Sequence, residues 1–142
     1  MRTWLVIEDE PDLYDMVLAM YSTLGVDGLS FTTGEEATEW IEEVENGKFK
    51  GELPEFGLLD IRLPGEIDGV MVGERLRGSP TMKNMVIVLM TAFKLSRKEE
   101  KEALSRTGAN LLLYKPLPKL TDFDKMVHNL LKGRRRRNGH SA

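Results

Sequence analysis

Four apolar runs of this chain end in residues that can bind a metal ion or a phosphoryl group. In chain order these residues are Glu8 and Asp9, then Asp60, Thr91 and Lys115. If the runs are parallel strands, their carboxyl ends meet at one edge of the sheet, where open α/β sheets bind ligands. The sequence therefore predicts one polar site built from residues that are far apart in the chain.

Asp60 is the central residue of this predicted site. It ends the apolar run 56–60 and is followed by Pro64, Gly65 and Gly69, which require the chain to turn. A carboxylate can attack phosphorus to form an aspartyl phosphate. Lys115 is a point charge suited to a phosphoryl oxygen, and Thr91 offers a hydroxyl donor. Asp60 is therefore the candidate nucleophile.

The carboxylates of the predicted site also indicate a metal ion. In a doubly wound sheet of strand order 2-1-3-4-5, Asp9 and Asp60 face each other across the crevice beside the first strand. With Glu8 they make three carboxylates that repel one another unless a proton or a cation intervenes. A hard divalent cation of the magnesium type relieves that repulsion through oxygen ligands. We therefore expect Mg²⁺ to be the cofactor.

The elements that must position these residues alternate along the chain. Apolar runs of strand type end before a turn, and segments with helical spacing follow them. The predicted strands are 3–7, 26–31, 56–60, 85–90 and 111–114, and the predicted helices are 13–24, 34–46, 70–77, 97–107 and 121–132. Alternation of this kind implies an α/β fold with a parallel sheet covered on both faces.

Capping patterns support three of the predicted helices. Thr33 with Glu36 and Ser96 with Glu99 have the spacing of capping boxes, and Thr121 with Asp124 suggests a similar cap on the last helix. Gly25 is expected to end the first helix.

Composition excludes several classes of protein. The chain has 142 residues, 41% hydrophobic and 30% charged, which is typical of one globular domain. It contains no cysteine, so disulfides and Cys-ligated zinc are excluded. No apolar run is long enough to cross a membrane, and the acids at 8–10 leave no room for a signal peptide. A cytoplasmic location is the simplest expectation.

Charge is distributed unevenly. Residues 1–131 contain all 23 acidic residues but only 15 of the 20 basic ones, a net charge of −8. An acidic body of this kind argues against nucleic-acid binding by the domain. Arg134 to Arg137 follow without apolar periodicity, so we expect a domain at 1–132 and a basic, flexible tail at 133–142. The role of the tail stays open, as does the choice between a stand-alone domain and a piece of a larger regulator.

Four pieces of sequence carry a resemblance to a known family. They are Leu5-Val-Ile-Glu-Asp-Glu-Pro-Asp12, Leu58-Leu-Asp-Ile-Arg-Leu-Pro64, Val88-Leu-Met-Thr-Ala92, and Gly108-Ala109 leading to Tyr114-Lys-Pro116. Each piece alone is weak, but the four occur in the same order as in the receiver domain of bacterial two-component response regulators. Over residues 3–132 the chain resembles that domain.

The resemblance implies a flavodoxin-like fold, a function and a set of site residues. Asp60 would accept a phosphoryl group from a histidine kinase or phosphotransfer protein. Glu8, Asp9 and the backbone carbonyl of Arg62 would complete the magnesium site around Asp60. Thr91 and Lys115 would contact the phosphoryl group, and the Lys115-Pro116 peptide bond would be cis. The protein would be a signalling switch and not an enzyme.

Three positions depart from the family pattern. Leu112 stands where relatives commonly carry a rotating aromatic ring, and Tyr114 lies immediately before the lysine instead. We therefore expect the signal to pass through the loop 91–96 and the fourth helix, without an aromatic ring acting as the switch. Arg62 and Phe93 occupy the positions that tune hydrolysis of the phosphoryl group, and Phe93 is expected to obstruct the attacking water.

Two other functions remain open, and so does part of the partner prediction. An aspartate-nucleophile phosphatase generally has a second acid two residues after the nucleophile, where this chain has Arg62. An adaptor that works without phosphorylation would need neither the acids nor Lys115. The downstream partner is expected on the face formed by the fourth helix, fifth strand and fifth helix. Homodimer formation stays open.

Overall fold

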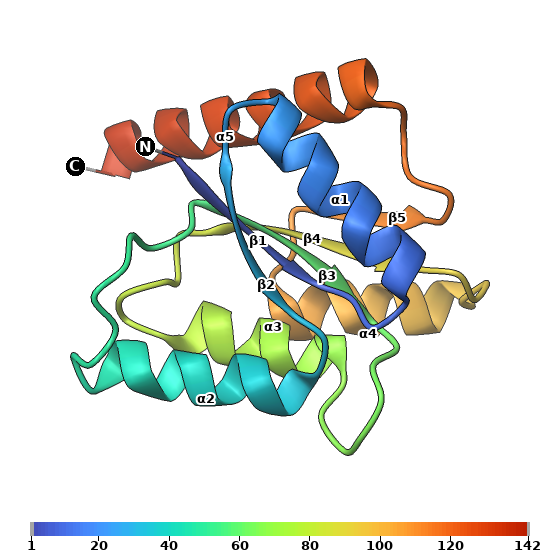
Figure 1. The fold of residues 1–142 in the computed structure, drawn as a ribbon, viewed down its shortest axis with the longest axis horizontal. Coiled ribbons are helices and arrows are strands. Elements are labelled where there is room, and N and C mark those ends of the chain that lie inside the picture. The colour runs from blue at the N-terminus through green and yellow to red at the C-terminus, as the bar shows by residue number, and fades with distance from the viewer. Residues whose placement is uncertain (1, 142) are drawn as a thin grey trace.

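A five-stranded sheet with helices on both of its faces forms the molecule (Figure 1). The computed structural model describes residues 2–141, and side chains as far as Arg134. The strands are β1 (Thr3–Ile7), β2 (Asp27–Phe31), β3 (Phe56–Asp60), β4 (Val86–Thr91) and β5 (Leu111–Tyr114). The helices are α1 (Pro11–Thr23), α2 (Gly34–Glu45), α3 (Gly69–Gly78), α4 (Arg97–Thr107) and α5 (Leu120–Ser141).

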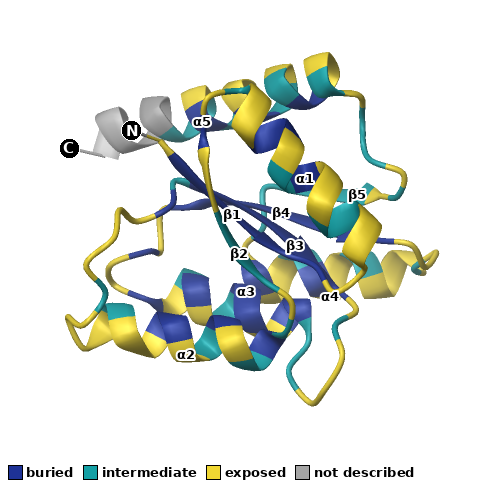
Figure 2. Ribbon diagram, viewed as in Figure 1, coloured by how far each residue is buried: buried dark blue, intermediate teal, exposed yellow. Residues whose placement is uncertain are grey.

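The sheet has the predicted topology. All four strand pairs are parallel, and the spatial order is β2-β1-β3-β4-β5. Every residue of β1, β3 and β4 is buried, which explains why these strands read as continuous apolar runs (Figure 2). The two edge strands are more exposed. Because the central strands end beside one another, the polar residues that follow them meet at one edge.

Two apolar layers fix the sheet between the helices. Trp4 and Val6 of β1 pack in the layer under α1 and α5, whereas Leu5 and Ile7 pack in the layer that includes α2 and α3. Figure 1 shows α1 and α5 on one face and α2, α3 and α4 on the other. This arrangement of five parallel strands and five helices is the flavodoxin-like fold that the resemblance implied.

Two helix ends agree with the sequence: Ser96 and Glu99 form the predicted capping box of α4, and α1 ends at Thr23 just before Gly25, whose φ is 74°. The predicted box of α2 is only half formed, because the Thr33 hydroxyl accepts from the Glu36 amide but the Glu36 carboxylate accepts from the Thr32 amide. The predicted Thr121 cap is wrong, because α5 begins at Leu120 and the carbonyl of Lys119 accepts from the Phe123 amide.

The last helix also continues past its predicted end at 132, to Ser141. Arginine is a good helix former, so the absence of apolar periodicity after residue 132 does not by itself end a helix. Arg134 donates to the carbonyl of Glu55 at 3.2 Å. Residue 142 of the predicted tail lies outside the described residues, and the division into domain and tail stays a prediction. No described helix is long and apolar enough to cross a membrane.

Candidate functional site

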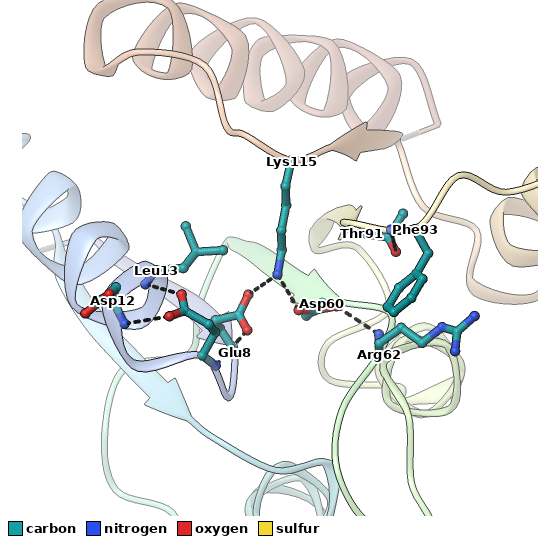
Figure 3. A network of polar contacts seen from close by, with 9 residues as sticks. Glu8, Asp12, Leu13, Asp60, Arg62, Thr91, Phe93 and Lys115 are labelled. Atoms are coloured by element: carbon teal, nitrogen blue, oxygen red, sulfur yellow. Dashed lines mark hydrogen bonds and ion pairs between the residues drawn. The ribbon is translucent and has the colours of Figure 1, made fainter.

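Lys115 joins two carboxylates at the carboxyl end of the sheet. Its Nζ donates to Asp60 Oδ2 at 2.7 Å and to Glu8 Oε1 at 2.8 Å (Figure 3). Glu8 is fully buried and Asp60 is 3% exposed, so both carboxylates depend on this cation for compensation. Residues separated by 107 positions thus meet as the sequence predicted.

Burial and hydrogen bonding shift the pKa values of Glu8 and Lys115 in opposite directions. Burial raises the pKa of Glu8, and the hydrogen bonds from Lys115 and from the Glu10 amide oppose that rise. Burial acts to lower the pKa of Lys115, but its hydrogen bonds to Asp60 and Glu8 outweigh burial and raise it. Lys115 is therefore a permanent cation at neutral pH.

Three carboxylates of the site are close enough to share a metal ion. One oxygen from each of Glu8, Asp9 and Asp60 lies within 4.8 Å of the others. Burial is the main cause that raises the pKa of Asp9, and the neighbouring Glu8 carboxylate adds to the rise. A donor set made only of carboxylate oxygens fits Mg²⁺ and not a thiolate- or imidazole-binding metal.

Glu10, the third acid of the run after β1, has a different role from Glu8 and Asp9. Its carboxylate caps α1 by accepting from the amides of Asp12 at 3.3 Å and Leu13 at 2.8 Å. The run 8–10 therefore divides between the site and a helix end. Sequence alone did not separate these roles, because the position of a cap relative to Pro11 depends on where the helix begins.

The loop after β3 is held tightly around Asp60. The Arg62 amide donates to Asp60 Oδ1 at 2.8 Å, so both carboxylate oxygens have a donor. The Gly69 amide donates to the carbonyl of Ile61 at 2.9 Å, and a Cβ at Gly69 would lie 1.9 Å from the Asp60 carbonyl oxygen. Only glycine permits this approach, so Gly69 closes the loop beneath the carboxylate.

Glu35 at the start of α2 holds the other end of this loop. Its carboxylate accepts from the amides of Glu66 at 3.0 Å and Ile67 at 3.3 Å. Its own amide and those of Glu66 and Ile67 lower the pKa of Glu35. The sequence analysis missed this role, because no spacing rule connects an acid on one helix with a loop more than 30 residues away.

Arg62 and Phe93 contact each other at the rim of the site. The guanidinium carbon of Arg62 lies 4.2 Å from the centroid of the Phe93 ring, which is a cation–π contact. Phe93 is 53% exposed, and its backbone amide donates to Thr91 Oγ1 at 3.1 Å. The two residues predicted to tune hydrolysis therefore form one unit beside Asp60 and Thr91 (Figure 3).

Leu112 and Tyr114 differ in what they contact. Leu112 is half-buried and packs against the core layer that includes α2 and α3. Tyr114 donates its hydroxyl to Glu100 Oε2 at 2.6 Å and accepts from the Leu95 amide at 3.3 Å. Tyr114 thus connects β5 both to α4 and to the loop after β4. The Lys115-Pro116 peptide bond is cis, as predicted.

Comparison with known proteins identifies a family. The family model of the response regulator receiver domain matches residues 4–128. Among solved structures, a putative response regulator from Chloroflexus aurantiacus J-10-fl is 28% identical, with 92% of this chain and 98% of that chain covered and a TM-score of 0.74. The BeF3-activated N-terminal receiver domain of Klebsiella pneumoniae RstA is 26% identical, with 91% and 98% covered and a TM-score of 0.70.

A third structure supports the fold alone. It is the CheY-like response regulator receiver domain protein from Methanospirillum hungatei JF-1, which is 19% identical, with 96% of this chain and 98% of that chain covered and a TM-score of 0.76. A search of curated proteins gave no match.

Proposed function

Because this chain belongs to the response regulator receiver domain family, we propose that it is a switch that takes a phosphoryl group onto Asp60. The donor is a histidine kinase or a phosphotransfer protein. One observation carries the proposal: the Asp60 carboxylate is nearly buried, contacts Lys115 at 2.7 Å and lies within 4.8 Å of oxygens from Glu8 and Asp9.

The chemistry is phosphoryl transfer between a nitrogen and an oxygen. An Asp60 oxygen attacks phosphorus, an O–P bond forms, the N–P bond to the donor histidine breaks, and its electron pair returns to the ring nitrogen. Lys115 is within hydrogen-bond reach of Asp60 and offsets charge on the transferring oxygens. Thr91 ends the neighbouring strand β4, and its hydroxyl is the second proposed contact of the phosphoryl group.

We propose Glu8, Asp9, Asp60 and the backbone carbonyl of Arg62 as the residues that hold Mg²⁺. When bound, the ion neutralises oxygens of the phosphoryl group and of the carboxylates. The buried Glu8 and the exposed Asp9 would hold it from the β1 side, opposite Asp60.

The test is mass spectrometry of the intact protein after treatment with a small-molecule phosphodonor and Mg²⁺. We expect the mass of one phosphoryl group to be added to the wild type and not to Asp60→Asn. Glu66→Gln, which changes an exposed acid in the same loop, is the matched control and should be modified like the wild type. Absence of the added mass in the wild type would favour an adaptor that works without phosphorylation.

A second measurement separates a switch from an enzyme. We propose that the protein does not turn over separate substrates, because the residue two positions after Asp60 is Arg62, whose guanidinium stacks on Phe93. Incubation with small phosphate esters should therefore release no phosphate beyond one equivalent. Sustained release that depends on Asp60 would revive the phosphatase alternative.

Tyr114 is our candidate for transmitting the phosphorylated state. It lies next to Lys115 in the chain and bonds Glu100 of α4 and Leu95 of the loop after β4. A movement of Lys115 or Thr91 toward a phosphoryl group would displace these bonds and shift α4. The loop 91–96 and α4 would then carry the signal as the sequence predicted, but with the hydroxyl of Tyr114 taking part, where the sequence analysis expected no aromatic residue to do so.

The output surface of this proposal is the face of α4, β5 and α5. A hollow of about 480 Å³ lies there, lined in part by Ala92, Leu95, Tyr114 and Lys115. A partner bound in it would contact Tyr114, so a change in the hydrogen bonds of Tyr114 would alter the surface that the partner binds. Addition of beryllium fluoride and Mg²⁺ should shift the amide resonances of residues 91–96 and of Glu100. No shift in that segment would defeat this route. The identity of the kinase, the output and the formation of a homodimer stay open, and a cytoplasmic location stays a prediction.

A further inference from the structure

The loop between β3 and α3 carries one of the proposed Mg²⁺ ligands, the backbone carbonyl of Arg62. Hydrogen bonds beside Asp60 close the base of this loop. The tip of the loop is attached to a different element, because the amides of Glu66 and Ile67 donate to Glu35 Oε2 at 3.0 and 3.3 Å. Glu35 is the second residue of α2, so the loop connects the phosphoacceptor site to that helix.

The backbone at the tip of the loop lies very close to the first turn of α2. Gly65 has a φ of 85°, a conformation that residues with a Cβ rarely adopt. A Cβ at Gly65 would also lie 2.7 Å from Glu35 Oε2. On the helix side, a Cβ at Gly34 would overlap the carbonyl oxygen of Ile67. Two glycines therefore permit an approach that larger residues would prevent.

Glu35 and its neighbour Glu36 have different partners. The Glu36 carboxylate accepts from Thr32 and Thr33, the residues just before α2. Glu35 instead extends to the loop. An ionised carboxylate is favoured in this position, because it lies at the positive end of the helix dipole and accepts from two amides.

Few other contacts hold the tip of the loop. Among the described residues, the amides at 63–67 form no hydrogen bond other than the two to Glu35. Leu63 and Ile67 are half-buried and pack against the core layer of α2 and α3. Apolar packing is not directional, so it does not fix how the peptide groups of the loop are oriented. Glu35 supplies the directional contact.

The orientation of these peptide groups matters at Arg62. Its amide donates to Asp60 Oδ1 at 2.8 Å, but its carbonyl belongs to the next peptide group, on the side of the loop that leads to the tip. Arg62 is exposed, so water can accept the carbonyl in many orientations. A hard cation binds oxygen ligands only at short and nearly fixed distances. A loop with a loose tip would therefore present this ligand less well.

We propose that Glu35 is a positioning residue of the metal site. The inference rests on the proposed function, in which the Arg62 carbonyl is a ligand of Mg²⁺. Glu35 does not contact the ion. By accepting from the amides of Glu66 and Ile67, it keeps the loop in the conformation in which the Arg62 carbonyl lies beside Asp60. The affinity for Mg²⁺ thus depends on the first turn of α2, which carries none of the proposed ligands.

The first test is a Mg²⁺ titration of the intact protein, followed by its NMR amide signals. We expect Glu35→Ala to weaken Mg²⁺ binding by roughly three- to tenfold, because a group that orients a ligand contributes to metal affinity without touching the metal. Glu39→Ala removes an equal charge from an exposed position one turn further along α2 and should bind Mg²⁺ like the wild type. Unchanged affinity in Glu35→Ala, or an equal loss in both variants, would overturn the proposal.

Two further variants separate position from charge. Glu35→Gln loses the charge but keeps an oxygen that can accept from the loop amides, so it should weaken binding less than Glu35→Ala does. Gly34→Ala keeps the carboxylate but pushes the loop away, so we expect it to weaken binding. If Glu35→Gln binds as weakly as Glu35→Ala, the charge acts alone and the positioning role is overturned. That comparison decides the question even if Gly34→Ala does not fold.

Hydrogen exchange without Mg²⁺ tests the positioning role independently of the metal. In Glu35→Ala the Arg62 amide should exchange roughly two- to tenfold faster, because the loop opens more readily. The Ile61 amide donates to Met90 of the neighbouring strand and should keep its wild-type rate. Unchanged exchange at Arg62 overturns the proposal, whether or not the wild type binds Mg²⁺. Faster exchange in a protein that binds no Mg²⁺ would refute the proposed metal site and support the positioning of the loop by Glu35.

Discussion

Two groups of carboxylates in the described part of the chain differ in whether a cation is paired with them. At the carboxyl end of the sheet, Lys115 bonds both Glu8 and Asp60. Beside α2, Glu39 and Glu43 have no ion-pair partner among the residues whose side chains are described. Glu8 and Asp60 of the first group are buried, whereas Glu39 and Glu43 of the second are exposed.

The difference follows from what solvent can do for each charge. A buried carboxylate without a cation costs several kcal/mol, so the interior cluster must include Lys115 for the chain to fold. Water screens an exposed carboxylate, so the second cluster can stay uncompensated at a cost of a few tenths of a kcal/mol. Neutralising a charge should therefore have opposite effects on stability in the two places.

The largest effect is expected from Lys115→Met. The substitution leaves Glu8 and Asp60 without their cation, and we expect the free energy of unfolding to fall by roughly 2–4 kcal/mol. Chemical denaturation at pH 7 measures it. Lys119→Met, at an exposed position without a recorded ion pair, should change stability by less than about 0.5 kcal/mol.

Chemical denaturation in the presence of Mg²⁺ tests whether the metal ion can compensate the same carboxylates as Lys115. An ion bound by the three carboxylates supplies the missing positive charge, so Mg²⁺ should stabilise Lys115→Met more than the wild type. Equal stabilisation of both proteins would show that Lys115 and the metal do not compensate the same carboxylates.

Tyr114→Phe tests whether the hydrogen bonds of Tyr114 connect the region around Lys115 to α4. The variant keeps the ring and loses the bonds to Glu100 and Leu95, so we expect a small loss in the free energy of unfolding, less than that of Lys115→Met. Tyr14→Phe is a control of the same chemistry, since that hydroxyl bonds Ser30 outside the site. The control should leave the amide resonances of residues 91–96 in place, and Tyr114→Phe should shift them.

The pH dependence of Tyr114 checks the same bond. The hydrogen bond to Glu100 is the main cause that raises the pKa of Tyr114 above its ordinary value of 10.0. A raised pKa means that the bond contributes below pH 10 and is lost as the pH rises through the folded-state pKa. In Glu100→Gln the pKa should fall back toward 10.0, as followed by NMR of the Tyr114 ring carbons. An unchanged pKa would contradict the bond.

Phe93→Ala tests the rim of the phosphoacceptor site. Removing the ring ends the contact with Arg62 and opens a path for water, so we expect the phosphoryl group to be lost about two- to fivefold faster. Decay of the added mass measures the rate. Equal or slower decay in the variant would defeat the obstruction argument.

The smallest effect, and the one of opposite sign, is expected from Glu43→Gln. The change removes repulsion with Glu39 and an unfavourable interaction with the helix dipole, so stability should rise by about 0.3–1 kcal/mol. Thermal denaturation of the variant and of the wild type measures the difference. A loss of stability would mean that Glu43 has a partner inside the chain, and the contrast between the two clusters would fail.

Much of the fold and the interior cluster followed from the order of residues. Apolar runs buried on both faces, with Gly and Pro after them, placed Asp60, Thr91 and Lys115 at strand ends, and the parallel sheet then brought them together. Hydrophobic burial determines this part, and it depends on local patterns that a sequence displays directly.

The tertiary structure alone decided how the polar groups pair across elements. Glu10 turned to a helix end, Glu35 reached the loop after Asp60, Tyr114 bonded α4, and α5 continued beyond its predicted end. Hydrogen bonds between residues remote in the chain form only when the two atoms lie about 2.7–3.2 Å apart, and no periodicity in the sequence encodes positions to within a few tenths of an ångström.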